Sequence, residues 1–221
     1  MFRLILMSAS IVIALLGIQF PAQAEDDDRR AALAVPSNTP AKNFYVGGRL
    51  GFGDNDYPGS NQDGSVTNVR SESNDTTFAL TGGYHLNENV AVQAGYHDFG
   101  QSDFAGDSSG GESWNAGPVS ALHESDGWEL GVMGRWPITD RWYGLGFMGW
   151  LWWESKETFV ESTGTTTVSE SGGDATYAVG LEYDTGQRNK LFYRFMGSHH
   201  KVGDFGYDVN SASAEMVWRF P

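Results

Sequence analysis

The sequence predicts an all-β fold, an eight-stranded antiparallel up-and-down transmembrane β-barrel that spans residues 43–221. Segments of about ten residues alternate large apolar side chains with small or polar ones, which is strand periodicity at the length that a tilted membrane strand needs. The connections between these segments are alternately short and long, as in barrels with short turns on one side of the membrane. After the N-terminal leader, no stretch approaches the roughly 20 apolar residues of a membrane helix.

Residues 1–24 are predicted to be a cleaved signal peptide. Arg3 precedes an apolar stretch that ends at Pro21, and an A-x-A cleavage site ends at Ala24. A membrane anchor is the alternative, which the small-residue site and the acidic residues directly after it disfavour. Residues 25–42 are polar, contain proline and have no period, so they predict a flexible periplasmic extension.

The strands are justified by their alternation and by the turn residues between them. The connections after the second, fourth and sixth strands are short, while those at 54–74, 100–126 and 154–173 are long. A soluble barrel has no reason to gather its long connections at one end. The strands are expected at 43–53, 75–86, 90–99, 127–138, 141–153, 174–184, 190–200 and 209–220.

The two faces of these strands differ in a way that fits lipid outside and a polar interior. One face is bulky, with aromatic residues near both strand ends, as in an interfacial girdle. A soluble lipocalin-like barrel would place its apolar residues inside instead. The segment 141–153 is apolar on both faces, so a bulge is expected there. The aromatic residues assigned to the lipid interface are Phe44, Phe52, Tyr96, Trp128, Trp136, Tyr183, Trp218 and Phe220.

The other face carries glycines and isolated charges, which would fill the interior. Eight strands leave space for little more than side chains, and buried charges are tolerated when they are paired. Glu182 and Arg194 are hypothesised to pair, because a short turn joins their strands. Arg49 and Arg219 lie on the first and last strands, which close the barrel. The residues assigned to the interior are Arg49, Glu129, Arg135, Glu182, Arg194, Glu215 and Arg219.

Composition excludes several classes of partner and site. The formal charge of −14 argues against nucleic acid, because phosphate binding needs clustered Lys and Arg. The absence of cysteine excludes a disulfide scaffold and a thiolate metal site. The long connections are acidic and rich in Gly, Ser and Thr, which predicts mobile loops. Such loops could meet lipopolysaccharide phosphates through divalent cations, or a basic host or phage ligand.

Several passages together resemble the eight-stranded membrane domain of the outer-membrane protein A family. The resemblance covers residues 43–220 and implies an outer-membrane location in a Gram-negative cell and insertion by the barrel-assembly machinery. Pro221 after the terminal aromatic departs from the family pattern, and without a peptidoglycan-binding domain no cell-wall tether is expected. The passages are 44–52 (FYVGGRLGF), 136–140 (WPITD), 180–183 (GLEY), 208–211 (DVNS) and 218–220 (WRF).

The candidate residues for enzyme chemistry are Ser198-His199-His200, with Asp204 as the orienting acid. Some eight-stranded barrels modify lipid A, but their deacylases carry a His-x-Ser-Asn arrangement that this segment lacks. Neighbouring strand residues also point to opposite faces, so Ser198 and His199 diverge. No catalytic residue, cofactor or metal ligand is expected. The calcium-loop-like run that starts at Asp54 also fails, because Ser65 replaces the required acid.

The favoured interpretation is an integral outer-membrane barrel with a filled interior, acidic surface loops and a structural role in the envelope. The first alternative is a surface adhesin or receptor acting through loops 54–74, 100–126 and 154–173. The second is a small-solute channel, and the third is a lipid A-modifying enzyme. The expected partners are outer-membrane lipid and lipopolysaccharide, the barrel-assembly machinery and a host or phage ligand at the loops, with no nucleic acid.

Overall fold

The computed structural model describes residues 44–55, 64–72, 74–186, 191–202 and 208–220. The predicted signal peptide with Ala24, the extension at 25–42, Asp204 and Pro221 all lie outside the described residues. None of the described residues forms a helix long and apolar enough to cross a membrane.

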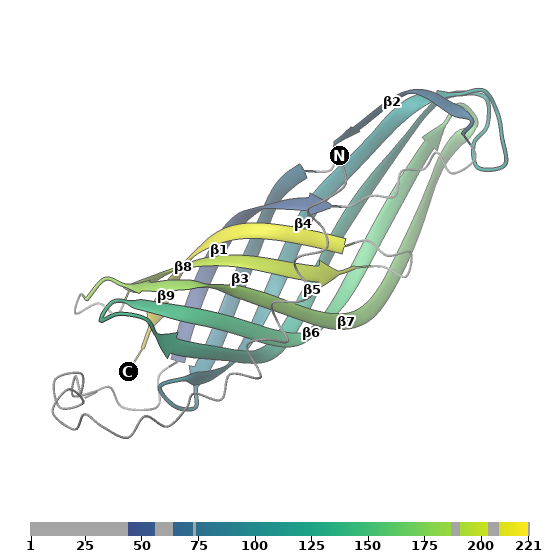
Figure 1. Cartoon of the computed structure of the whole chain (residues 1–221). Helices are drawn as coiled ribbons and strands as arrows, with labels where there is room; N and C mark the ends of the chain where they lie inside the picture. Colours follow the sequence, from purple (N-terminus) through teal and green to yellow (C-terminus); the bar gives the residue numbers. More distant parts are fainter. Residues whose placement is uncertain (1–43, 56–63, 73, 187–190, 203–207, 221) are drawn as a thin grey trace, which may run out of the picture. The chain divides into compact units, whose positions relative to one another are not determined.

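The described residues form antiparallel strands that close into a ring (Figure 1). Around the ring the order is β1, β3, β4, β5, β6, β7, β8, β9 and back to β1, while β2 pairs only with β4. The prediction of an eight-stranded antiparallel barrel is therefore confirmed. The strands are β1 (Phe44–Asn55), β2 (Val66–Glu72), β3 (Asn74–His85), β4 (Val90–Ser108), β5 (Gly117–Pro137), β6 (Trp142–Glu161), β7 (Gly164–Asp184), β8 (Leu191–Lys201) and β9 (Asp208–Arg219).

The long connections are mostly strands rather than the mobile loops that the sequence predicted. β4 continues to Ser108 and β5 starts at Gly117, while β6 and β7 run on to Glu161 and from Gly164. Beyond the barrel, water meets both faces, so the extended strands lose the apolar alternation on which the prediction relied. Their β-branched and aromatic residues still favour a sheet. The prediction that 100–126 and 154–173 are loops is wrong for most of these residues, since 109–116 and 162–163 are the parts that lie outside strands.

We call this extension the outer sheet; its strand order is β2, β4, β5, β6, β7. It comprises β2, residues 101–108 of β4, 117–125 of β5, 154–161 of β6 and 164–171 of β7. One face holds a small apolar core of Val66, Phe104, Trp114, Val119 and Ala121, against which Phe159 packs. Because this core draws on β2, β4, β5 and β6, it ties the extended strands together.

The bulge expected in the segment 141–153 is absent. The register of β6 runs without a shift along both β5 and β7. Both faces are apolar for different reasons: Trp150 and Trp152 point outward, whereas Leu151 and Trp153 are buried inside. The Trp153 ring lies where a Cβ on Gly172 would be, so glycine makes room for the indole.

Candidate functional site

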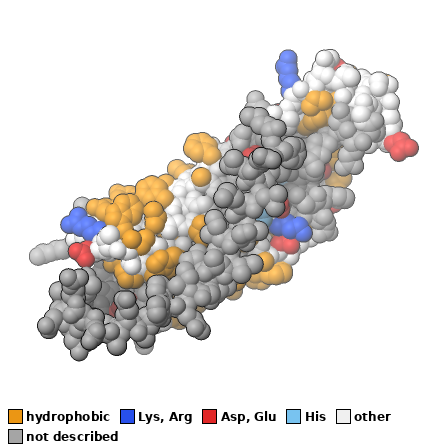
Figure 2. Space-filling model, viewed as in Figure 1, with side chains coloured by type: hydrophobic (Ala, Val, Ile, Leu, Met, Phe, Trp, Pro, Cys, Tyr) orange, Lys and Arg blue, Asp and Glu red, His pale blue; other side chains and the backbone are white. Residues whose placement is uncertain are grey.

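The outer wall of the barrel is covered with exposed apolar side chains. Trp128 is 65% exposed and Phe52 is 74% exposed, although both would be buried in a soluble protein. Tyr96 and Tyr183 are partly exposed, and Tyr96 donates a hydrogen bond of 2.7 Å to Asp126. Figure 2 shows hydrophobic side chains gathered along the barrel wall. The other predicted interface aromatics, Phe44, Trp136, Trp218 and Phe220, are also exposed.

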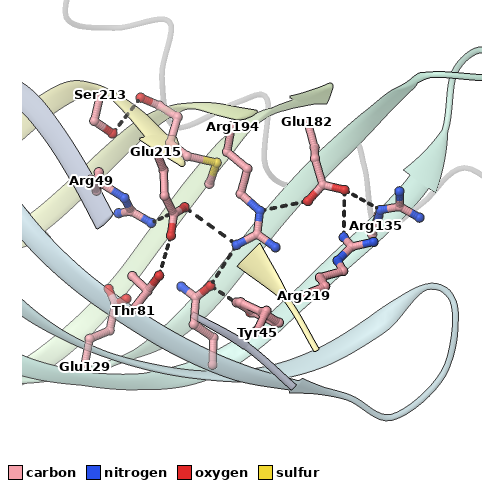
Figure 3. A network of polar contacts seen from close by, with 12 residues as sticks. Tyr45, Arg49, Thr81, Glu129, Arg135, Glu182, Arg194, Ser213, Glu215 and Arg219 are labelled. Carbon is pink, nitrogen blue, oxygen red and sulfur yellow. Dashed lines mark hydrogen bonds and ion pairs between the residues drawn. The ribbon is translucent and has the colours of Figure 1, made fainter. Parts of the chain in front are cut away.

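The barrel interior contains a row of alternating charges that crosses four neighbouring strands. Glu182 on β7 lies directly opposite Arg194 on β8, which lies opposite Glu215 on β9, which lies opposite Arg49 on β1. The four side chains face the lumen, because strand residues at paired positions share a face. Glu182 and Arg194 are 0% exposed. Acid and base thus alternate around half of the ring (Figure 3).

Glu182 contacts more arginine side chains than any other residue of this row. Arg194 Nε donates to Glu182 Oε2 at 2.8 Å, which confirms the hypothesised Glu182–Arg194 pair. Arg135 Nε and Arg219 Nη2 each donate to Glu182 Oε1 at 2.8 Å. A buried carboxylate is tolerated when several charged donors replace its water. The Glu182 carboxylate therefore links its own strand, β7, to β5, β8 and β9.

Glu215 and Gln93 extend the network across the lumen. Arg49 Nη2 and Arg194 Nη1 lie 3.5 and 3.6 Å from Glu215 Oε2. The Tyr45 hydroxyl donates to Gln93 Oε1 at 2.8 Å, and Arg194 Nη1 donates to the same oxygen at 3.4 Å. Thr81 also donates to Glu215. The lumen is filled at this level by side chains from β1, β3, β4, β8 and β9.

Glu129 belongs to a second polar cluster, nearer the outer sheet. His97 Nε2 lies 3.2 Å from Glu129 Oε1, and Thr176 Oγ1 donates to Glu129 Oε2 at 3.2 Å. His200 Nδ1 lies 2.8 Å from Thr176 Oγ1 and 3.8 Å from Glu129 Oε2. Among the interior acids named from sequence, Glu129 is paired with histidines, whereas Glu182 and Glu215 are paired with arginines.

An apolar layer adjoins this second cluster. Phe99 contacts both His97 and His200, with ring centroids 5.6 and 4.9 Å apart. Phe99 packs in one cluster with Leu151, Trp153, Val202 and Val209, all of which are buried. The interior therefore has three filled levels: the charged row, the histidine cluster and this apolar layer.

The arrangement at Ser198 differs from the one expected. Ser198 and His200, two residues apart, share the inward face, and His200 Nε2 lies 3.1 Å from Ser198 Oγ. With Thr176 and Glu129 this resembles a nucleophile–base–acid series. All four residues are more than nine-tenths buried, and Ser198 Oγ also lies 2.6 Å from Ser211 Oγ. Sequence reasoning compared Ser198 with His199 and so missed the pair that the i, i+2 spacing brings together.

The outer face of the extended strands carries an acidic hollow of about 560 Å³. Lys156 is the basic residue among its carboxylates. Among the described residues, no three His, Asp or Glu side chains are placed to hold a metal ion. The acidic residues that line the hollow are Asp75, Asp98, Glu124, Asp126 and Glu154.

These features define an integral β-barrel of the bacterial outer membrane: a closed antiparallel ring, an apolar outer wall and a polar, filled interior. The sequence matches the model of the OmpA-like transmembrane domain over residues 39–221. The chain belongs to this family and is located in the outer membrane.

Several solved structures are similar to this chain at low sequence identity. Ail, the attachment invasion locus protein of Yersinia pestis, is 14% identical, with a TM-score of 0.48 over 81% of this chain and 99% of that one. The N-terminal β-barrel domain of OprF from Pseudomonas aeruginosa is 12% identical, with a TM-score of 0.44 over 79% and 97%. OprG from the same organism is 12% identical, with a TM-score of 0.47 over 81% and 96%. No curated protein matches the sequence.

Proposed function

We propose that this protein is a non-conducting, non-enzymatic barrel that holds an acidic β-sheet at the cell surface and contributes to the structure of the envelope. The observation that carries the proposal is the buried row from Glu182 to Arg49, in which each charge is paired across neighbouring strands. An eight-stranded barrel is just wide enough for side chains to fill it. The histidine cluster and the apolar layer add two further barriers to any solute.

The barrel wall supports the lipid contacts that this role requires. Exposed apolar residues on β1, β5, β6 and β9 would meet acyl chains, and aromatic rings near the strand ends would lie at the interfaces. Outer-membrane lipid and lipopolysaccharide are therefore the proposed neighbours of the wall. The barrel-assembly machinery is the proposed route of insertion.

Planar-bilayer recording from purified, refolded protein tests the closed lumen. We expect no discrete conductance steps under conditions in which a 16-stranded porin, used as the positive control, opens readily. Reproducible steps from wild-type protein that migrates as the folded, heat-modifiable form would support the small-solute channel instead. Lipid A from cells that overproduce the protein is expected to keep its mass, and a changed mass would support the enzyme.

A surface receptor is the second candidate, and the outer sheet favours it. Most residues of segments 100–126 and 154–173 belong to paired strands, which would present a fixed surface to a partner rather than a flexible one. Ordering these residues before binding lowers the entropy lost when a complex forms. The partner, whether from a host or a phage, would meet a predominantly acidic surface.

A further inference from the structure

In the part of the chain that the structure describes, the outer half of β7 is paired with a strand on one side only. β6 pairs with β7 along its whole length, up to Glu161 opposite Gly164. β8 pairs with β7 only from Tyr177, which lies opposite His199. Within the described ranges, residues 164–173 of β7 therefore have a strand neighbour on one side alone. Alternate backbone N–H and C=O groups of this segment point away from the sheet.

The two edges of the outer sheet differ in how they are protected. β2, at one edge, has a register shift between Thr67 and Arg70, and Asn68 has a positive φ of 54°. Such irregularity is a usual device against unwanted strand pairing. The β7 edge is more regular: its register with β6 is continuous, residues 164–173 contain neither proline nor lysine, and Glu170 is their one charged residue. The exposed run Thr165–Val168 is β-branched throughout, which favours an added strand.

Side chains on this edge define what an added strand would need. Val168 and Glu170 share one face with Glu157 of the adjacent strand, since Val168 lies opposite Glu157 and Glu170 opposite Ser155. Thr167 and Ser169 lie on the other face and carry hydroxyls. One face of an incoming strand would therefore meet carboxylates, and the other would meet hydroxyls, with Lys156 one strand farther away, opposite Ser169.

We propose that the outer edge of β7 binds an extended, basic peptide segment of a protein partner, which adds to the outer sheet as a further strand. The proposal rests on the proposed function, because a displayed sheet is what makes the edge available. The segment from Gly164 to Ser171 is roughly 25 Å long, which fits a peptide of about eight residues. A second copy of this chain is the less suitable occupant, because it would bring two acidic edges together.

Binding can be measured with the full-length protein, refolded in lipid nanodiscs, and fluorescent nonapeptides. The probe peptide alternates Lys with Thr and Val, so that one face is basic and the other resembles the β7 edge. A second peptide has Glu in place of every Lys. A third keeps every side chain of the probe but is N-methylated at two consecutive central residues, which blocks hydrogen bonding on both of its edges.

We expect the probe to bind in fluorescence anisotropy, and both the acidic and the N-methylated peptides to bind at least roughly tenfold more weakly. Equal affinity for the probe and its N-methylated form would overturn the proposal, because contact by charge alone needs no backbone hydrogen bonds. Failure of all three peptides to bind would overturn it as well.

Variants locate the binding edge on the protein. Val168→Pro and Ser169→Pro are made separately, because consecutive N–H groups point to opposite edges and one of the two is free. We expect at least one of these variants to bind the probe roughly tenfold more weakly, while Ser71→Pro on β2 stays within about twofold of wild type. All variants must keep heat-modifiable migration. An equal effect of Ser71→Pro would refute the assignment to β7.

The outcomes separate this inference from the proposed function. Channel conductance would refute the filled barrel but would not affect the peptide-binding result. Absence of peptide binding would refute the assignment of the β7 edge but not the closed barrel. A stable dimer that Val168→Pro or Ser169→Pro dissolves would assign the edge to a second copy and overturn the peptide proposal.

Discussion

The barrel wall and the outer sheet are built from the same strands, yet their outward faces are opposite in character. On β6 the outward residues are Trp150 and Trp152 and then Glu154 and Lys156, so the change falls between residues 152 and 154. On β5, Trp128 gives way to Asp126 in the same register, since Trp128 lies opposite Trp152 and Asp126 opposite Glu154. The strands continue without interruption while their surroundings change from lipid to water. The outward face of this continuous sheet therefore shows where the membrane ends.

The inward faces change as well, but in the other direction. Within the barrel wall the lumen holds the paired charges around Glu182 and Arg194. In the outer sheet the inward face becomes apolar on β4 and β5, with Phe104 and Val119 in its small core. The paired charges thus lie inside where lipid is outside, beside buried apolar residues such as Met133 and Phe147, whereas the small apolar core lies inside where water is outside. In each region, the side chains that the surrounding lipid or water would solvate poorly are turned inward.

The largest loss of stability is expected where the lumen is charged. Arg194→Met leaves Glu182 without its Nε donor and removes one of the two guanidinium groups next to Glu215, so both buried carboxylates lose a charged partner at once. We expect a loss of about 3–5 kcal/mol in the free energy of unfolding. Urea titration of the refolded protein, followed by heat-modifiable gel migration, measures it. Arg141→Met, in an exposed turn, is the control and should change stability by less than about 0.5 kcal/mol.

The pair itself can be isolated by a double-mutant cycle. Glu182→Gln should destabilise the barrel on its own, and combining it with Arg194→Met should cost less than the two separate losses added together. Strict additivity would contradict a direct interaction between Glu182 and Arg194, and the row would then be a set of independent charges.

A substitution matched between the two regions tests where lipid ends. Val132 on β5 and Val160 on β6 are 50% and 44% exposed, and both point outward, one from the barrel wall and one from the outer sheet. Val132→Arg should cost about 2–4 kcal/mol in lipid vesicles, because it places a charge against acyl chains. Val160→Arg should change stability by less than about 0.5 kcal/mol, because water surrounds it. Similar losses at both sites would mean that the wall is not defined by lipid.

Sequence reasoning succeeded where a short turn fixes the register. The turn between β7 and β8 makes Glu182 and Arg194 neighbours, and alternation places both inside, so their contact could be named in advance. The partners of Glu215 could not be named in advance, because a longer connection separates β8 from β9 and leaves the register of these two strands open. Gln93 and Tyr45 were on the inward face by alternation, but uncharged residues gave no reason to single them out.

The outer sheet was missed for a related reason. Hydrophobic alternation reveals a strand only where its two faces meet different surroundings, and residues 164–171 are polar on both faces. The β-branched run Thr165–Val168 was the remaining signal, yet threonine is also common in loops. The pairing of Glu129 with His97 and His200 was hidden in the same way, because it depends on three strands that are distant in sequence.

The smallest effect concerns His123, which lies on the inward face of the outer sheet. Burial lowers the pKa of His123 below its ordinary value of 6.5, because desolvation disfavours the charged imidazolium. The unfolded chain then binds more protons than the folded one as the pH falls below 6.5, so the outer sheet should lose stability toward acid. His123→Gln removes this titrating group from the outer sheet and leaves the ionisable groups of the barrel wall unchanged. Amide hydrogen exchange should therefore quicken on residues 101–108 and 117–125 of wild type between pH 7 and 5, by more than in His123→Gln. An identical response in the two proteins would show that the carboxylates of the outer sheet, rather than this histidine, set its response to acid.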